Sequence, residues 1–282
     1  MRWLVTGAAG MLGTDVVALL RDRGEAVTPV TRAELDLTDT TAVTTAVAGH
    51  DVVVNCAAWT AVDDAQDHEA EATVVNADVP RILAVAAGEH GARLVQVSTD
   101  YVFDGSATRP YAEDAPTNPA SAYGRSKAAG EHAVRRQLPA DHLIVRTAWL
   151  YGAHGSCFPK TIARVARENG AVSVVEDQVG QPTWTADVAA LVHRLVAGRV
   201  PSGTYHATSS GACTWFEFAR EVVRAAGLDA SVVAPTTSAA MVRPAPRPAY
   251  SVLCHRGLER HGVPPIGDWR ERWRAAAPVV LG

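Results

Sequence analysis

The sequence is poor in the residues that characterise several protein classes. Its 282 residues include only four cysteines, at positions 56, 157, 213 and 254, without a CxxC pair or a metal-ligand spacing. This scarcity argues against a disulfide-stapled secreted domain and a zinc module, and it indicates reduced thiols in the cytoplasm. No apolar run reaches the roughly 18 residues of a membrane span. Strand-forming residues follow Met1 and Arg2 directly, so no signal peptide is expected.

An excess of positive charge is also lacking. The chain has 26 basic and 30 acidic residues, for a formal net charge of −4, and no basic stripe is evident. Proteins that bind nucleic acids present such a stripe or patch to the phosphates. Nucleic acid is therefore not an expected partner, and any anionic ligand must be held by local groups.

What the chain does contain is an alternation of short apolar runs and helical patterns. Strands are expected at residues 3–6, 26–30, 52–56, 94–97 and 143–145, and helices at 14–23, 40–48, 69–90 and 121–137. Continuous apolar strands need cover on both faces, which helices in the crossovers supply. The sequence therefore predicts an α/β fold with a doubly wound parallel sheet.

The pattern becomes less regular after residue 150. Helices are expected near 160–168 and 187–197 and a strand at 172–175, before a proline-rich stretch and a polar tail that contains tryptophans. We expect residues 1–150 to form the core and residues 151–282 to form mainly a smaller substrate lobe. Residues 203–207 are expected to return to the main sheet as a late strand, and the tail to be irregular structure packed over a cleft.

A glycine-rich turn joins the first expected strand to the first expected helix. It places glycines at 7, 10 and 13, with Met11 and Leu12 between the last two. In this context a GxxGxxG spacing permits a tight turn, and the helix N-terminus presents free N–H groups to a pyrophosphate. A turn that merely packs a helix on a strand is the alternative. We favour a dinucleotide site in a Rossmann-type core.

The end of the second strand bears on which dinucleotide binds. An acid there would accept from the ribose hydroxyls of NAD, whereas this chain has Thr31 and Arg32. A guanidinium suits the extra phosphate of NADP, so NADP(H) is favoured, with NADH as the alternative because Glu34 is near. Asp36, followed by Leu37, is expected to accept from the adenine amine. Its alternative role is that of an acid at a helix N-terminus.

A second constellation combines a strand-end pair, Ser98 and Thr99, with Tyr123 and Lys127 on an expected helix. A spacing of four places the last two on one helical face. The ammonium is then expected to lower the phenol's pKa and to hold the nicotinamide ribose, so that Tyr123 donates a proton to a carbonyl. A hydroxyl of Thr99 or Ser98 would hydrogen-bond that carbonyl. By itself, YxxxK also fits an ordinary surface helix.

With these motifs the chain resembles the extended short-chain dehydrogenase/reductase superfamily and, within it, the dTDP-4-dehydrorhamnose reductase family. The narrower resemblance rests on four blocks, NCAAWTAVD at 55–63, STDYVFDG at 98–105, RTAWLYG at 146–152 and DQVGQPT at 177–183. STDYVFDG is the most specific of them. The resemblance implies reduction of a dTDP-4-keto-6-deoxyhexose by NADPH, with dTDP-L-rhamnose as the product if the substrate is dTDP-4-dehydrorhamnose.

The motifs and the resemblance together give three sets of candidate residues. Those expected to bind the cofactor are Gly7, Gly10, Met11, Leu12, Gly13, Thr31, Arg32, Asp36, Leu37, Ala57, Ala58, Trp59, Thr60, Ser98, Tyr123 and Lys127. Those expected to contact the sugar are Thr99, Asp100, Tyr101 and Trp149. Catalysis is assigned to Thr99, Tyr123 and Lys127.

Three further positions bear on the substrate and on metal binding. Trp149 could stack on a sugar ring or a base, or belong to the core, and the resemblance favours the sugar. No histidine spacing indicates a metal site. Some members of the family use Mg²⁺ at a homodimer contact, for which Asp15 alone is too little. Tyr250 stands where the family's late proline-rich segment usually has an asparagine, which leaves the substrate sugar open.

Three alternative functions stay open at this stage. One is reduction of another dTDP-4-keto sugar, as in the dihydrostreptose-forming reductases. A second is a nucleotide-sugar epimerase or dehydratase, for which Asp100 would be the acid beside the threonine. The third is a non-catalytic regulatory subunit on the same fold, which retention of the three catalytic residues argues against.

Overall fold

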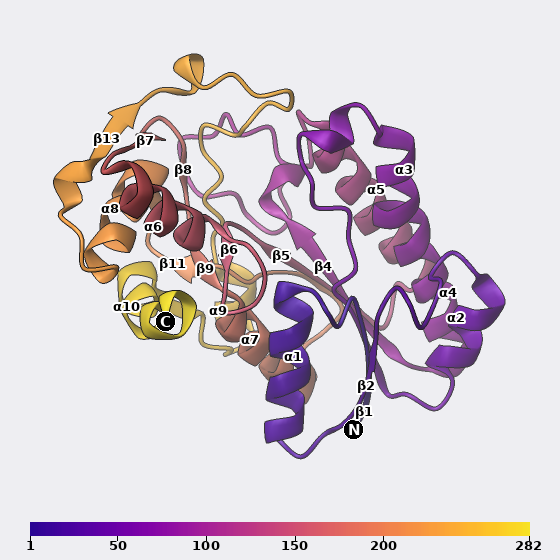
Figure 1. Ribbon diagram of the computed structural model, residues 1–282. Helices are drawn as coiled ribbons and strands as arrows, with labels where there is room; N and C mark the ends of the chain where they lie inside the picture. Colours follow the sequence, from indigo (N-terminus) through magenta and orange to yellow (C-terminus); the bar gives the residue numbers. More distant parts are fainter.

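A central six-stranded sheet organises the molecule, whose computed structural model describes residues 1–282. All its strand pairs are parallel, in the order β10-β5-β4-β3-β1-β2. The strands are β1 (Arg2–Thr6), β2 (Ala26–Val30), β3 (Val52–Asn55), β4 (Arg93–Thr99), β5 (His142–Thr147) and β10 (Gly203–His206). Figure 1 shows this sheet between two groups of helices. The predicted doubly wound α/β fold is confirmed.

Alternating side chains of the strands feed two separate hydrophobic clusters. On β1, Trp3 and Val5 belong to a cluster with α1 (Met11–Asp22) and α7 (Thr185–Ala197). Leu4, between them, joins a cluster on the other face with α2 (Thr40–Val47) and α4 (Val79–His90). Successive residues of a strand point to opposite faces, so both faces of these apolar strands are covered.

The expected helix 69–90 is present but is interrupted by one wider turn. It consists of α3 (Glu69–Thr73), a π-helical turn (Val74–Asp78) and α4, and it ends at Gly91 in the left-handed conformation. Such π turns frequently accompany functional sites. Here the turn carries Asn76, which is buried and takes part in the site described below.

The last strand of the sheet comes from late in the chain. After α5 (Ala122–Gln137) and β5, the chain leaves the sheet, forms part of a second lobe, and comes back through α7 to β10 beside β5. Tyr205 in β10 pairs with Val145 in β5. The sheet is thus completed by residues well beyond position 150.

The second lobe has its own hydrophobic core. It is built from α6 (Phe158–Asn169), α8 (Trp215–Ala225), α10 (Trp269–Leu281) and short strand pairs, of which β13 (Val233–Thr236) with β7 (Val172–Val175) is the longest. In Figure 1 this lobe lies beside the open end of the sheet, with its strands and helices in orange, brown and yellow. Phe218 and Trp273 are among its fully buried residues.

The prediction of an irregular tail is wrong, because residues 269–281 form a regular helix, α10. Asp268 caps this helix by accepting from the Arg270 N–H at 2.9 Å. Trp269, Trp273 and Ala277 recur every four residues and are buried, which is the period of an amphipathic helix. Polar arginines between them concealed this period.

No helix has the length and apolarity that a membrane crossing requires, and all four cysteines are free thiols.

Candidate active site

The glycine turn is shaped by the close approach of two backbone segments. Gly7 has φ +66°, and a Cβ there would lie 2.6 Å from the Ala57 nitrogen at the end of β3. A Cβ on Gly13 would collide with the Gly7 carbonyl. Gly10 is the N-cap of α1 and provides no side-chain hydrogen bond. The first N–H groups of α1 therefore have no side-chain cap, and the residues present fit a pyrophosphate.

At the end of β2, the loop is held by its own acids. The Thr31 N–H and hydroxyl both donate to the Glu34 carboxylate, at 2.8 and 2.7 Å, and these bonds lower the pKa of Glu34. Arg32 is exposed and uncommitted to an acid. The Asp36 carboxylate accepts from the Thr38 N–H and hydroxyl, at 2.9 and 2.7 Å. The N-cap of α2 is Asp39, so Asp36 does not have the alternative capping role.

The Ala57–Thr60 segment after β3 is fixed by a residue that the sequence patterns did not single out. The Asn76 side chain accepts from the Trp59 N–H at 2.9 Å and donates to the Trp59 carbonyl at 3.1 Å. It also donates to the Ser126 hydroxyl on α5 at 3.0 Å. One amide thus aligns the expected nicotinamide wall with the helix that carries the candidate catalytic pair.

Thr99, Tyr123 and Lys127 come together at the carboxyl end of β4: Thr99 and Tyr123 are hydrogen-bonded to each other, the Lys127 ammonium donates to the Val97 carbonyl of the same strand, and all three residues are buried. The Thr99 hydroxyl donates to Asp100 at 2.9 Å. Ser121 caps α5 by accepting from the Gly124 N–H at 3.1 Å, which fixes the helix start just before Tyr123. Open parallel sheets bind ligands at this edge, so a carbonyl substrate could reach both a hydroxyl and a phenol here.

The expected net direction of the Tyr123 pKa shift is wrong for this structure, because the pKa is raised and not lowered. Burial raises the pKa of Tyr123, the Thr99 hydroxyl opposes the rise, and the Asp100 charge adds to it. The Lys127 ammonium instead donates to the Val97 carbonyl at 2.7 Å. Burial lowers the pKa of Lys127 itself to about 8. The loss of hydration on burial therefore has a larger effect on the pKa of Tyr123 than the ammonium that the four-residue spacing places on the same helical face.

The Ser98 hydroxyl, which was expected to bind the cofactor or the carbonyl, is already committed to another residue. It donates to the buried Glu131 carboxylate at 2.6 Å. Ser98 and Thr99 are neighbours in a strand, so their side chains point to opposite faces of the sheet. Only Thr99 offers its hydroxyl to the site. Glu131 belongs to no predicted motif, although it lies four residues after Lys127.

Asp100 and Tyr101, which directly follow Thr99, lie beside Tyr123. Burial raises the pKa of Asp100 to about 6, against hydrogen bonds from Ser251 and Thr99, and one of its carboxylate oxygens has no partner. The Tyr101 ring meets the Tyr123 ring edge-on, at 5.6 Å between centroids. A buried carboxylate oxygen without a partner is a group that a sugar hydroxyl could satisfy.

Trp149 lies at the junction between the core and the second lobe. It has a positive φ of 48°. Its ring stacks on Trp215, with centroids 3.6 Å apart, and its edge lies against Gly180. One face of Trp149 is therefore already covered, and only its remaining surface can contact a sugar. Tyr250 pairs with Val179, the residue before Gly180, and its N–H donates to the Gly105 carbonyl at 3.0 Å.

A strap from the second lobe, residues 237–250, crosses to the core. Asp63, at the end of the NCAAWTAVD block, accepts from Arg247 at 2.8 Å and from the Ala245 N–H at 3.2 Å. Arg243 lies 3.5 Å from the same carboxylate. Although burial opposes it, these contacts hold the pKa of Asp63 below its usual range. The orange and yellow strap reaches the purple core at the top of Figure 1.

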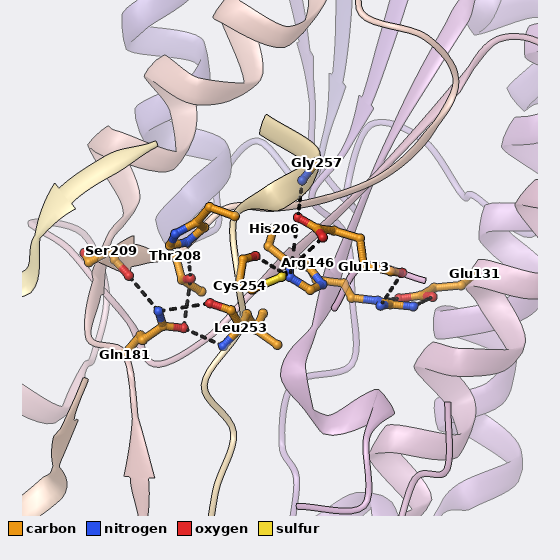
Figure 2. A network of polar contacts seen from close by, with 11 residues as sticks. Glu113, Glu131, Arg146, Gln181, His206, Thr208, Ser209, Leu253, Cys254 and Gly257 are labelled. Atoms are coloured by element: carbon orange, nitrogen blue, oxygen red, sulfur yellow. Dashed lines mark hydrogen bonds and ion pairs between the residues drawn. The ribbon is translucent and has the colours of Figure 1, made fainter. Parts of the chain in front are cut away.

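Two groups of side chains bear on metal binding. Asp15 lies 3.7 Å from His154 rather than among other acids. Glu113, His206 and Cys254 do converge, with candidate ligand atoms within 4.8 Å of one another. Burial lowers the pKa of His206 to about 3, and the charge of Arg146 adds to this effect. In Figure 2 the Arg146 side chain extends from the side of this group toward Glu131. A cation there would be repelled by Arg146.

Comparisons with known proteins agree with this site. The family model described as RmlD substrate binding domain matches residues 1–279. A dTDP-4-dehydrorhamnose reductase of Streptomyces griseus is 51% identical, over 100% of this chain and 94% of that protein. A dTDP-4-keto-6-deoxy-D-glucose reductase of Streptomyces niveus is 47% identical, over 99% of this chain and 97% of that protein.

A solved structure extends the likeness to three dimensions. A dTDP-4-dehydrorhamnose reductase from Bacillus anthracis, crystallised in complex with NADP, superposes with a TM-score of 0.94. The two sequences are 36% identical, and the superposition covers 98% of each chain. With the glycine turn, the Thr99–Tyr123–Lys127 cluster and these matches over nearly every residue, the chain belongs to the dTDP-4-dehydrorhamnose reductase family.

Proposed function

We propose that this protein reduces the 4-keto group of a dTDP-4-keto-6-deoxyhexose with NADPH, most simply dTDP-4-dehydrorhamnose to dTDP-L-rhamnose. The observation that carries the proposal is the buried cluster of Thr99, Tyr123 and Lys127 at the carboxyl end of β4, beside the glycine turn. The names of the Streptomyces griseus and Bacillus anthracis relatives support the same reaction.

Each residue of the cluster has a distinct part. When bound, NADPH supplies the hydride for the carbonyl carbon. The Thr99 hydroxyl and the Tyr123 phenol hydrogen-bond the carbonyl oxygen, and Tyr123 gives it a proton. A high pKa keeps the phenol protonated until the oxygen becomes basic. The Lys127 ammonium stabilises the phenolate that remains and holds ribose hydroxyls.

We assign the cofactor and the sugar to opposite sides of this cluster. Gly7 to Gly13, Thr31 and Arg32, Asp36 and Leu37, and Ala57 to Thr60 would hold NADPH from the core. Asp100, Tyr101 and Trp149 would contact the sugar. On this division residues 1–150 with β10 bind the cofactor and the rest of 151–282 forms the substrate lobe. We also propose that the protein is located in the cytoplasm and forms a homodimer. Analytical sedimentation tests the oligomeric state.

The identity of the keto sugar is the finest part of the proposal. The Streptomyces niveus relative, named a dTDP-4-keto-6-deoxy-D-glucose reductase, is nearly as similar as the rhamnose-type relative. The backbone of Tyr250 contacts Gly105 and β8 (Val179–Gly180), and its side chain is a phenol where the family usually has an amide. A different sugar epimer is therefore the second candidate.

The decisive experiment is incubation of the purified protein with NADPH or NADH and a panel of dTDP-4-keto-6-deoxyhexoses. We expect stoichiometric loss of NADPH absorbance and a 4-hydroxy product whose stereochemistry NMR identifies. Turnover of sugar without net NADPH consumption would instead indicate an epimerase or dehydratase. If no sugar of the panel is turned over, the chain is a non-catalytic member of the family.

A further inference from the structure

A buried carboxylate, that of Glu131, lies behind the proposed catalytic cluster and has no part in it so far. One oxygen accepts from the Ser98 hydroxyl at 2.6 Å and from Arg146 Nε at 2.8 Å. The other accepts from Arg146 Nη2 at 2.7 Å and from Arg135 at 2.8 Å. Figure 2 shows the paired approach of Arg146 to Glu131. Such a bidentate pair fixes both side chains in one orientation.

Stability alone is a poor reason for this arrangement. Glu131 and Arg146 are each 1% exposed, so both charges have lost their hydration. Apolar side chains of similar size are often as stabilising as a buried ion pair. The pair therefore needs a second explanation, and its neighbours suggest one. Ser98 adjoins Thr99 in β4, and Lys127 lies one helical turn before Glu131 on α5.

The surroundings of Lys127 show what Glu131 contributes. The Lys127 ammonium donates to the Val97 carbonyl of β4 at 2.7 Å. The charge of Glu131, four residues later on the same helix, and that of a Cys56 thiolate, just after β3, would both raise the pKa of Lys127 against the effect of burial. Burial raises the pKa of Cys56 to about 12, so this thiol is neutral at physiological pH. Arg146 and Ser98 keep the pKa of Glu131 low despite its burial, so the carboxylate stays charged.

We propose that Glu131, held by Arg146, is a positioning residue that keeps the Lys127 side chain in its ammonium form and anchors the Ser98–Thr99 end of β4. Burial removes the hydration of the ammonium and favours the neutral amine. The negative charge of Glu131 opposes this effect from one helical turn away. The inference rests on the proposed function only for its kinetic consequences.

The sequence makes a direct test possible, because Lys127 and Lys160 are its only two lysines. Protein labelled with ¹³C at the lysine ε-carbon gives two signals, which the Lys127→Met variant assigns. Their chemical shifts are followed against pH in the wild type and in Glu131→Gln. We expect the Lys127 midpoint to move to lower pH by about one unit in the variant, the size of effect that a nearby opposite charge produces. The Lys160 midpoint serves as the internal reference.

Kinetics provide a second readout. The rate should fall as pH rises through the pKa of Lys127, near 8, because the neutral amine no longer stabilises the phenolate. In Glu131→Gln the alkaline limb of kcat should shift in the same direction as the NMR midpoint, with kcat at pH 8 lower by about fivefold. If no sugar is turned over by the wild type, the proposed function fails while the NMR result still decides the role of Glu131.

Two further variants separate charge from folding. Arg135→Gln removes a partner of Glu131 that is 38% exposed, and it leaves the buried pair in place, so the Lys127 midpoint should not move. Glu131→Gln leaves the Arg146 charge buried and alone. If that variant does not fold, Glu131→Gln with Arg146→Gln replaces it, and the same downward shift is expected. An unchanged Lys127 midpoint in a folded Glu131 variant, or an equal shift in Arg135→Gln, overturns the proposal.

Discussion

At the scale of single residues, Tyr123 carries the most specific part of the proposed chemistry. Replacing it with phenylalanine keeps the buried ring and its contact with Tyr101 but removes the proton. We expect kcat of Tyr123→Phe to fall by about 10²–10⁴-fold, the usual contribution of a general acid. NADPH binding, followed by fluorescence titration, should change by no more than a few-fold.

Tyr205→Phe is the matched control for that variant. The Tyr205 ring is buried, and its hydroxyl donates to the Pro201 carbonyl at 2.8 Å, at the outer edge of the sheet. This change should lower the melting temperature slightly and leave kcat unaltered. Normal turnover by Tyr123→Phe would show that another group delivers the proton.

We expect Arg32 to decide which dinucleotide the enzyme prefers. It is exposed, and the acids beside it are already bonded to threonines, so its guanidinium is free for the phosphate that distinguishes NADP from NAD. A charged hydrogen bond of this kind is worth about 1.5–3 kcal/mol, or roughly 10–100-fold in affinity. Arg32→Gln should raise KM for NADPH by that factor and leave KM for NADH nearly unchanged. Equal changes in the two KM values would show that Arg32 does not bind the phosphate. Arg23→Gln, at the exposed C-terminal end of α1, serves as the control.

At the scale of elements, the packing of α1 on the glycine turn depends on a missing side chain. A Cβ on Gly13 would collide with the Gly7 carbonyl, so Gly13→Ala must push α1 away from the turn. We expect a loss of about 1–3 kcal/mol of stability, as for other overpacked sites, together with weaker NADPH binding. Chemical denaturation and fluorescence titration measure the two effects.

Gly88→Ala is the opposite case and therefore the control for Gly13→Ala. Gly88 is exposed on α4, and its added Cβ would lie 3.5 Å from a Leu138 methyl, an ordinary contact. Alanine in a helix interior is favoured over glycine by about 1 kcal/mol. This variant should be more stable and bind NADPH normally. Unimpaired NADPH binding by Gly13→Ala would show that the turn tolerates a wider spacing.

The sequence predicted the elements of the core well because their physical signals are local. Apolar strands such as Val52–Asn55 and the helix that carries Tyr123 have clear periods and caps. The second lobe was harder, since its core comes from segments far apart in the chain. Trp269 and Trp273 pack on Phe218, some fifty residues earlier, which no local pattern reveals.

The site was predictable in part, for the same reason. Motif spacing brought Thr99, Tyr123 and Lys127 together correctly, but it could not show the environment of each group. Burial reversed the expected direction of the Tyr123 pKa, and strand alternation turned Ser98 toward Glu131. Asn76 was missed because its partner, the Trp59 peptide group, lies in another segment.

At the scale of the whole molecule, the core and the second lobe meet around the proposed substrate site. Two side-chain connections cross this boundary: Trp149 stacks on Trp215, and the 237–250 strap reaches Asp63. The stacked rings of the first have centroids only 3.6 Å apart. The strap, by contrast, is joined to the core chiefly by charged side chains and a few backbone contacts near Gly105. It is therefore the connection most easily loosened.

Asp63→Asn tests whether the strap closes the site. The amide can still accept from the Ala245 N–H, but it loses the charge that holds Arg247 and Arg243. Partly exposed pairs of this kind contribute about 1 kcal/mol or less, so the fold should persist. We expect faster hydrogen exchange in peptides covering 241–250 and a several-fold higher KM for the sugar, with NADPH binding unchanged. The control is Glu69→Gln, which breaks an exposed ion pair with Arg125 (2.6 Å) on the Rossmann-type core. It should change neither the exchange of the strap nor the KM for the sugar. Equal exchange of the strap in Asp63→Asn and the wild type would mean that the Gly105 and β8 backbone contacts alone hold the strap over the sugar.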